Sequence, residues 1–157
     1  MDLNMITDRT QGDVDRVIAL AGKVSAGTAT EAELTEWAAP LKGAYNASDL
    51  NRVGAAVAYV AGRLVNYGYT ITVSPRQDWQ DSDIPTPEDM ADYLADVAEL
   101  RSALTVSGDT PPVPADAVRL TYQEANNIEQ ILVDVDALLT KMAQAWFYSG
   151  EVYAGEV

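Results

Sequence analysis

The sequence predicts a mainly α-helical protein, a bundle of about four main helices with a small β element. Apolar residues recur at helical spacing in four long segments that open with helix-capping residues. One short segment instead alternates apolar and polar residues, as a half-buried strand does. The 157 residues fit one domain, residues 1–157, and we expect residues 1–8 and 149–157 to be docking arms.

Caps and periodicity place each helix along the chain. Thr30 and Glu33 form a capping box for a short helix that Pro40 ends. Thr86 is a cap followed by a proline at the first helical position. The predicted helices cover about residues 11–25, the short segment 30–39, residues 48–67, residues 87–104 and residues 121–148.

The last helix is the longest and has a heptad-like stripe. It opens at the capping box Thr121/Glu124, and its apolar positions are Ala125, Ile128, Leu132, Val135, Leu139, Met142 and Trp146. Ile131 and Leu138 widen this stripe, which favours a bundle core over a two-stranded coiled coil. We expect Gly150 to end the helix as a left-handed cap.

The strand pattern lies in YGYTITVSP, residues 67–75, where three apolar residues alternate with hydroxyl residues. A single strand cannot satisfy its own backbone, so it needs a partner. The candidates are the tail EVYAGEV, the N-terminal LNMIT and another chain. We predict that SGEVYAGEV, residues 149–157, is a docking strand whose Val152 and Tyr153 project to opposite faces.

The aromatic residues near the end of the chain predict a protein-protein contact. Three consecutive aromatics, Trp146 to Tyr148, would fan around a helix too widely for one core face to cover them. Trp37 and Trp79 are predicted to be core or edge anchors. The predicted partner-contact residues are Tyr67, Tyr69, Ile71, Val73, Trp146, Phe147, Tyr148, Val152 and Tyr153.

The charge balance narrows the choice of partners. The net charge is −14, and the ten basic residues are scattered. Nucleic acid and anionic membrane are therefore poor partners, because no basic patch can neutralise several phosphates. MDLNMITDRT lacks the basic and apolar regions of a signal peptide, so we expect the protein to be made and kept in a cytoplasm.

The residue types predict that the protein is not an enzyme and binds no cofactor, metal or small-molecule substrate. The chain has no histidine and no cysteine, which removes imidazole bases and thiolate ligands. Asp78, Asp81 and Asp83 lack the glycine and closing glutamate of an EF-hand and are read as a solvated loop. Glu129 and Asp136 are one heptad apart, as two catalytic carboxylates could be, but both are expected to be solvated. A carboxylate hydrolase is therefore only the third class of function that we consider.

Two glycines and two asparagines lie inside predicted helices. Gly54 and Gly62 are expected to let another helix approach closely, since an interior glycine costs ~1 kcal/mol relative to alanine. Asn51 and Asn126 are expected to cap or bridge buried polar groups. They also align in a weak echo between DLNRVGAAVAYVAGRL and EANNIEQILVDVDALL, for which duplication and a shared bundle pattern are both open.

Four stretches carry a family resemblance: KGAYNASDLNRVGAAVAYVAGRLVNYGY, DWQDSDIPTPEDM, LTYQEANNIEQILVDVDALL and AWFYSGEVYAGE. With them the chain resembles small, mostly uncharacterised proteins from the tail and virion modules of gut-bacterial prophages. The resemblance implies a structural or tail-assembly role in the virion, which is put together in the host cytoplasm, and it supplies no catalytic residues. The expected partners are further copies of the chain or neighbouring virion proteins. The alternative is a soluble prophage-encoded adaptor that is absent from particles.

Overall fold

The computed structural model describes the backbone of residues 3–154 and the side chains of residues 3–145. Its helices are α1 (Gln11–Ala26), α2 (Glu31–Trp37), α3 (Ala47–Asn66), α4 (Pro87–Ala103) and α5 (Tyr122–Ala154). The prediction of a mainly helical protein is confirmed. No strand forms within residues 3–154, so the predicted small β element is not seen in that part of the chain.

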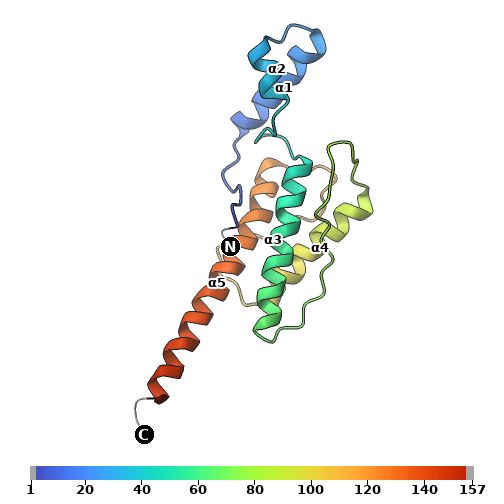
Figure 1. Cartoon of the computed structure of the whole chain (residues 1–157). Helices are drawn as coiled ribbons and strands as arrows, with labels where there is room; N and C mark the ends of the chain where they lie inside the picture. Colours follow the sequence, from blue (N-terminus) through green and yellow to red (C-terminus); the bar gives the residue numbers. More distant parts are fainter. Residues whose placement is uncertain (1–2, 155–157) are drawn as a thin grey trace.

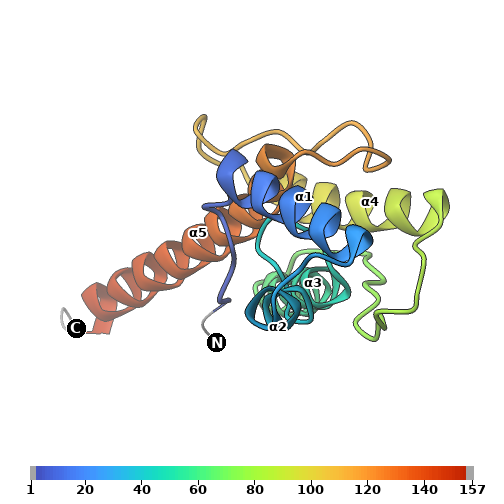
Figure 2. The same cartoon turned by 90° about the horizontal axis from the view of Figure 1, so that it is seen from above.

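Three of the four long helices build the core. α3, α4 and α5 pack against one another, and α1 packs with α2 as a hairpin at one end of the bundle (Figure 1). Seen from above, α1 and α2 lie across the end of the bundle (Figure 2). The largest fully buried apolar side chains of the bundle are Val53, Val57, Val60, Leu64, Val97, Leu100, Ile128, Ile131, Leu132, Val135 and Leu139.

The hairpin of α1 and α2 stands apart from the bundle core, and little of the apolar surface of α1 is buried. Leu20 is its only buried residue, and Ile18 is 64% exposed. Two ion pairs across the hairpin, Arg16 with Glu36 and Lys23 with Glu33, join α1 to α2.

The helix starts follow the predicted capping residues. Thr10, Thr30 and Thr86 each form a capping box with the acid three residues later, and Thr121 and Glu124 exchange the same bonds. α3 begins one residue earlier than predicted, because Asn46 and Asp49 form its box. α5 continues to Ala154, past the predicted end at Tyr148.

Gly150 does not end α5. The helix runs through it, so the predicted left-handed cap is wrong. The predicted docking strand is also wrong for residues 149–154, which are helical, and residues 155–157 lie outside the described part. The physical reason is that an interior glycine costs a helix only ~1 kcal/mol, which does not force the chain to reverse.

The connection between α3 and α4 is extended at residues 69–75 without being paired as a strand. Its residues alternate between half-buried and exposed, as the sequence pattern predicts. The amide of Thr72 donates to Glu99 on α4 at 3.4 Å, and the amide of Ser74 donates to Asp96 at 3.1 Å. Carboxylates of α4 therefore accept the hydrogen bonds that a neighbouring strand would otherwise accept.

Two asparagines hold two other extended segments, and each does so by binding both backbone groups of one residue. The Asn51 amide donates to the carbonyl of Trp79 and accepts from its N–H, at 2.9 and 2.8 Å. Asn126 does the same with the backbone of Arg9, at 2.9 and 3.0 Å. The expectation that these residues bridge buried polar groups is confirmed, and the two echoing helices share a structural role.

The glycines of α3 differ from each other. A Cβ on Gly54 would lie 2.3 Å from the carbonyl oxygen of Arg76, so this glycine is required by a close approach. The approaching group is the backbone of the α3–α4 connection and not the expected helix. A Cβ on Gly62 would meet nothing within 4 Å, so close packing does not explain that glycine.

Candidate functional site

The predicted partner-contact residues fall in two places, the α3–α4 connection and the C-terminal part of α5. The first place holds Tyr67, Tyr69, Ile71 and Val73, whose side chains are half-buried against the chain's own core. What this segment offers to a partner is therefore its exposed hydroxyl side chains and its backbone. The second place holds Trp146, Phe147, Tyr148, Val152 and Tyr153, whose side chains lie outside the described residues.

The C-terminal part of α5 leaves the bundle as a lone helix (Figure 1). Among the described side chains, Met142 is the last that packs against the core, and Gln144 and Ala145 are exposed. The backbone nevertheless stays helical to Ala154. Because isolated helices shorter than ~12–15 residues are marginal in water, this stretch would gain stability from a partner that covers its apolar positions.

The α3–α4 connection owes its position to carboxylates that are partly removed from water. Burial raises the pKa of Asp96 above its ordinary value, and the hydrogen bond from the Ser74 amide offsets part of that rise. Arg76 continues the connection over the ring of Trp79, with its guanidinium carbon 3.8 Å from the ring centroid. The segment therefore has a fixed place on the bundle.

A buried cluster of four charged side chains ties the N-terminal segment to the bundle. Arg9 donates to Asp49 at 2.8 Å and to Glu129 at 2.7 Å, and Arg52 donates to the same two carboxylates. The amide of Ile6 adds a bond of 2.6 Å to Glu129. Both oxygens of this fully buried glutamate are thus occupied by donors, and its expected solvation is wrong.

The surroundings of this cluster are aromatic. Arg9 lies over the ring of Tyr45, 5.5 Å from its centroid, and the hydroxyls of Tyr45 and Tyr93 are hydrogen-bonded to each other. Burial is the main cause that raises the pKa of both phenols. The Nε atom of Arg9 is the one buried nitrogen among the described side chains without a hydrogen-bond partner.

One signal in the sequence could have revealed this cluster. Glu129 follows the seam residue Ile128 directly and precedes Ile131, which widens the stripe. A position beside the seam of a bundle helix is commonly buried, and a charged residue there requires an opposite charge. Asp136, one heptad later, is part-exposed. Its carboxylate pairs with Arg63, so it too has an ion-pair partner within the chain.

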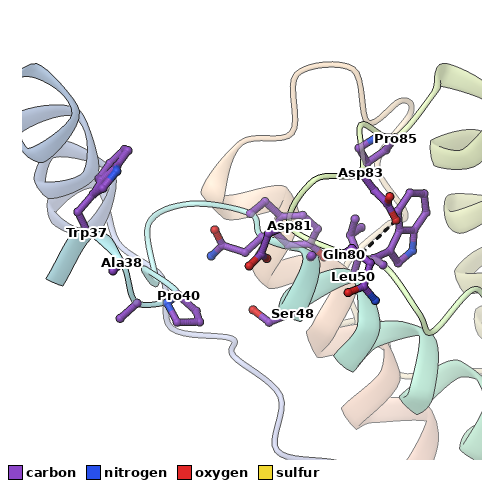
Figure 3. Close-up of a pocket in the computed structure, with 14 residues that line it drawn as sticks. Trp37, Ala38, Pro40, Ser48, Leu50, Gln80, Asp81, Asp83 and Pro85 are labelled. Carbon is purple, nitrogen blue, oxygen red and sulfur yellow. Dashed lines mark hydrogen bonds between the residues drawn. The ribbon is translucent and has the colours of Figure 1, made fainter. Parts of the chain in front are cut away.

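A cavity of about 530 Å³ lies where α2 ends, α3 begins and the loop of residues 79–85 passes (Figure 3). Trp37 stands at one side, and Asp81 and Pro85 come from the loop on the other. The amide of Gln80 donates to Asp83 across the loop at 3.0 Å. The walls combine aromatic and polar groups without a charged group that is buried and unpaired among the described residues.

Two of the three acidic loop residues are held by a single cation. Arg76 pairs with Asp78 at 2.9 Å and with Asp83 at 2.6 Å. Within the part of the chain that the structure describes, no three potential ligands gather to hold a metal ion. The expectation that the protein does not depend on divalent metal stays a prediction.

No protein-family model matches the chain, and neither a curated protein nor a solved structure is found to be similar to it. The resemblance to prophage virion proteins therefore stays a prediction. None of the helices in the described residues has the length and hydropathy to cross a membrane.

Proposed function

We propose that the protein is a non-enzymatic structural or assembly protein of a bacteriophage particle, which works by binding neighbouring proteins. The observation that carries this proposal is the C-terminal part of α5, which projects from the bundle as a helix without a partner in the described residues. In the sequence the heptad positions continue along it to Trp146. A regular apolar pattern on an uncovered helix is typical of helix-in-groove or coiled-coil contacts.

The arrangement of charged groups supports a binding role over a catalytic one. Glu129 and Asp49 are occupied by two guanidinium groups, so neither offers a free buried acid of the kind that a hydrolase requires. The net charge of −14 favours solubility at high local concentration, which suits a subunit of an assembly. The resemblance to virion-module proteins points to the same role.

Truncation after Ala145 tests the binding role. Core packing by Met142 is retained, so we expect the shortened chain to keep its cooperative unfolding. In analytical ultracentrifugation we expect the full chain to form higher-mass species and the shortened chain to lose them. The matched control is a chain that ends after residue 154. If the chain that ends after Ala145 associates like the full-length protein, the contact through α5 is contradicted.

A second candidate function is a prophage-encoded adaptor that does not enter particles. The cavity beside Trp37 favours it, since an open pocket of this size on the surface suits a transient ligand or peptide. Mass spectrometry of purified particles from an induced lysogen separates the two functions. The structural role requires the chain to be present in particles in stoichiometric amounts, and its absence from them would favour the adaptor.

A further inference from the structure

The extended segment of residues 69–75 has one edge that is bound to α4. The other edge is open at Ile71 and Val73, after the amide of Tyr69 has donated to the carbonyl of Leu64 at 3.1 Å. Thr72 and Ser74 donate their amides to carboxylates of α4. The amides of Ile71 and Val73 have no hydrogen-bond partner among the residues that the structure describes. Because alternate residues of an extended chain direct their backbone groups to the same side, these two amides lie on the edge that faces away from α4. Water must satisfy them in the isolated chain.

This open edge lacks most of the features that block pairing between edges. No charged residue occurs between Leu64 and Pro75. The side chains of Thr70, Thr72 and Ser74 are exposed hydroxyls, which other strands tolerate well. Proteins commonly protect exposed edges with lysine, proline or a bulge. Here only Pro75 does so, because it lacks an amide and limits pairing to the positions of Ile71 and Val73.

The surface beside the open edge leaves room for a second chain. The α3–α4 connection runs beside α3 on the side away from α5 (Figures 1 and 2). In helical register, Ala58 and Gly62 follow Gly54, where the backbone of the connection touches α3. A Cβ on Gly62 would meet nothing within 4 Å, and Val65 nearby is 53% exposed. Small side chains of this kind permit close approach of a neighbouring backbone.

We infer that this edge pairs with the same edge of a second copy of the chain, as two antiparallel strands related by a twofold axis at Thr72. Ile71 then lies opposite the partner's Val73, and the two pairs exchange four backbone hydrogen bonds. The two Thr72 residues face each other as a pair without hydrogen bonds between them. The amide of Thr72 is already bound to Glu99, which fits this register.

The occupant is a second copy because the edge is complementary to itself. Two chains of charge −14 repel each other, and residues 64–75 are a charge-free segment through which they can approach. The antiparallel register places Thr70 opposite the partner's Ser74, a pair of two small hydroxyl residues. Four hydrogen bonds and a small contact area give a weak complex in dilute solution, so the pairing is a contact for an assembly and not a stable free dimer.

Single-cysteine variants test the register directly, because the chain has no cysteine of its own. The inferred pairing places the Cα atoms of the two Thr72 residues about 4.5 Å apart, within the range of a disulfide. In Thr70→Cys and Ser74→Cys the equivalent cysteines are offset along the strands by several residues. All three side chains are exposed, so the variants should fold alike.

Under mild oxidation at equal concentration, Thr72→Cys should form disulfide dimers roughly tenfold faster than Thr70→Cys or Ser74→Cys, because pairing raises the effective thiol concentration. A mixture of Thr70→Cys and Ser74→Cys should form the mixed dimer at a rate close to that of Thr72→Cys. Hydrogen exchange should show concentration-dependent protection of the Ile71 and Val73 amides. Equal rates for the three single variants, or a preference for another position, would overturn the inference.

This inference deepens the proposed function. That the edge contact joins copies of the chain within a particle rests on the proposed function. The cross-linking test addresses the α3–α4 connection, whereas the truncation after Ala145 addresses α5, so each can fail without the other. The cysteine variants keep all of α5. The substitution Thr72→Cys can also be made in the chain truncated after Ala145. If it cross-links selectively in both the full and the truncated chain, the edge contact stands even when the contact through α5 is contradicted.

Discussion

Glu129 shows how one side chain can decide where a distant segment lies. It is fully buried on α5 and accepts hydrogen bonds from Arg9, Arg52 and the amide of Ile6. Taking a carboxylate out of water is costly, and this cost is offset only because two guanidinium groups and an amide surround it. The N-terminal segment is therefore tied to the bundle by charge as well as by the buried side chain of Leu3.

The substitution Glu129→Gln should destabilise the protein by about 3–5 kcal/mol, since it leaves buried guanidinium groups without one of their two opposite charges. Urea denaturation followed by circular dichroism measures the change. Asp81→Asn is the matched control, because Asp81 is exposed and makes no hydrogen bond in the described structure. A Glu129→Gln variant as stable as this control would show that the buried cluster contributes little.

The two glycines of α3 should respond to alanine in opposite directions. Gly54→Ala places a Cβ against the carbonyl of Arg76 and should cost roughly 1–3 kcal/mol through forced displacement of the backbone. Gly62→Ala meets open space and should stabilise the helix by about 0.5–1 kcal/mol. Thermal unfolding of the two variants measures both effects. The same sign for the two would contradict the assigned contact.

At the scale of elements, the extended segments depend on side chains of helices. Asn51 and Asn126 each bind both backbone groups of one residue, and Asp96 and Glu99 accept two amides. A buried amide or carbonyl without a partner costs about 1–3 kcal/mol, so these contacts replace the missing sheet. The structure thereby accommodates a strand-like sequence in a helical protein.

The hairpin of α1 and α2 should loosen in acid. The hydrogen bond from Lys23, followed by that from the Thr30 amide, lowers the pKa of Glu33 from its ordinary 4.5 to about 2. Because the folded pKa is the lower one, this contribution is complete above pH 4.5 and is lost as the pH falls toward 2. Amide chemical shifts of residues 11–37 measured across this range report the change. Glu33→Gln should flatten part of that profile, and an unchanged profile would contradict the assignment.

At the scale of the whole molecule, three parts differ in how much of their surface packs against the rest of the chain. The bundle of α3, α4 and α5 holds the core, the hairpin of α1 and α2 stands at one end, and α5 projects beyond the other (Figure 1). The acidic charge is spread over all of them. Association between copies must therefore overcome repulsion between whole molecules before any local contact forms.

Salt should strengthen self-association. The Debye length falls from about 30 Å at 0.01 M ionic strength to about 3 Å at 1 M, which screens repulsion between two chains of charge −14. Sedimentation velocity at several salt concentrations should show the average mass rising with salt. A fall in mass would indicate that ion pairs between copies, and not apolar or backbone contacts, hold the assembly.

The sequence by itself determined the features that depend on near neighbours along the chain. Thr86 and Pro87 start α4 as predicted, and the alternation in residues 69–75 correctly predicted which side chains face the core. Helix caps, helical period and strand period all arise from residues within a few positions of one another, so they can be read locally.

Only the tertiary structure decided the contacts between distant residues. Glu129 binds Arg9 across 120 positions, and Asn51 binds Trp79 across 28. The replacement of a partner strand by Asp96 and Glu99 and the point where α5 leaves the bundle depend on how the helices pack. The physical reason is that burial and pairing of a polar group are set by whatever the fold brings beside it, and spacing along the chain carries no record of that neighbour.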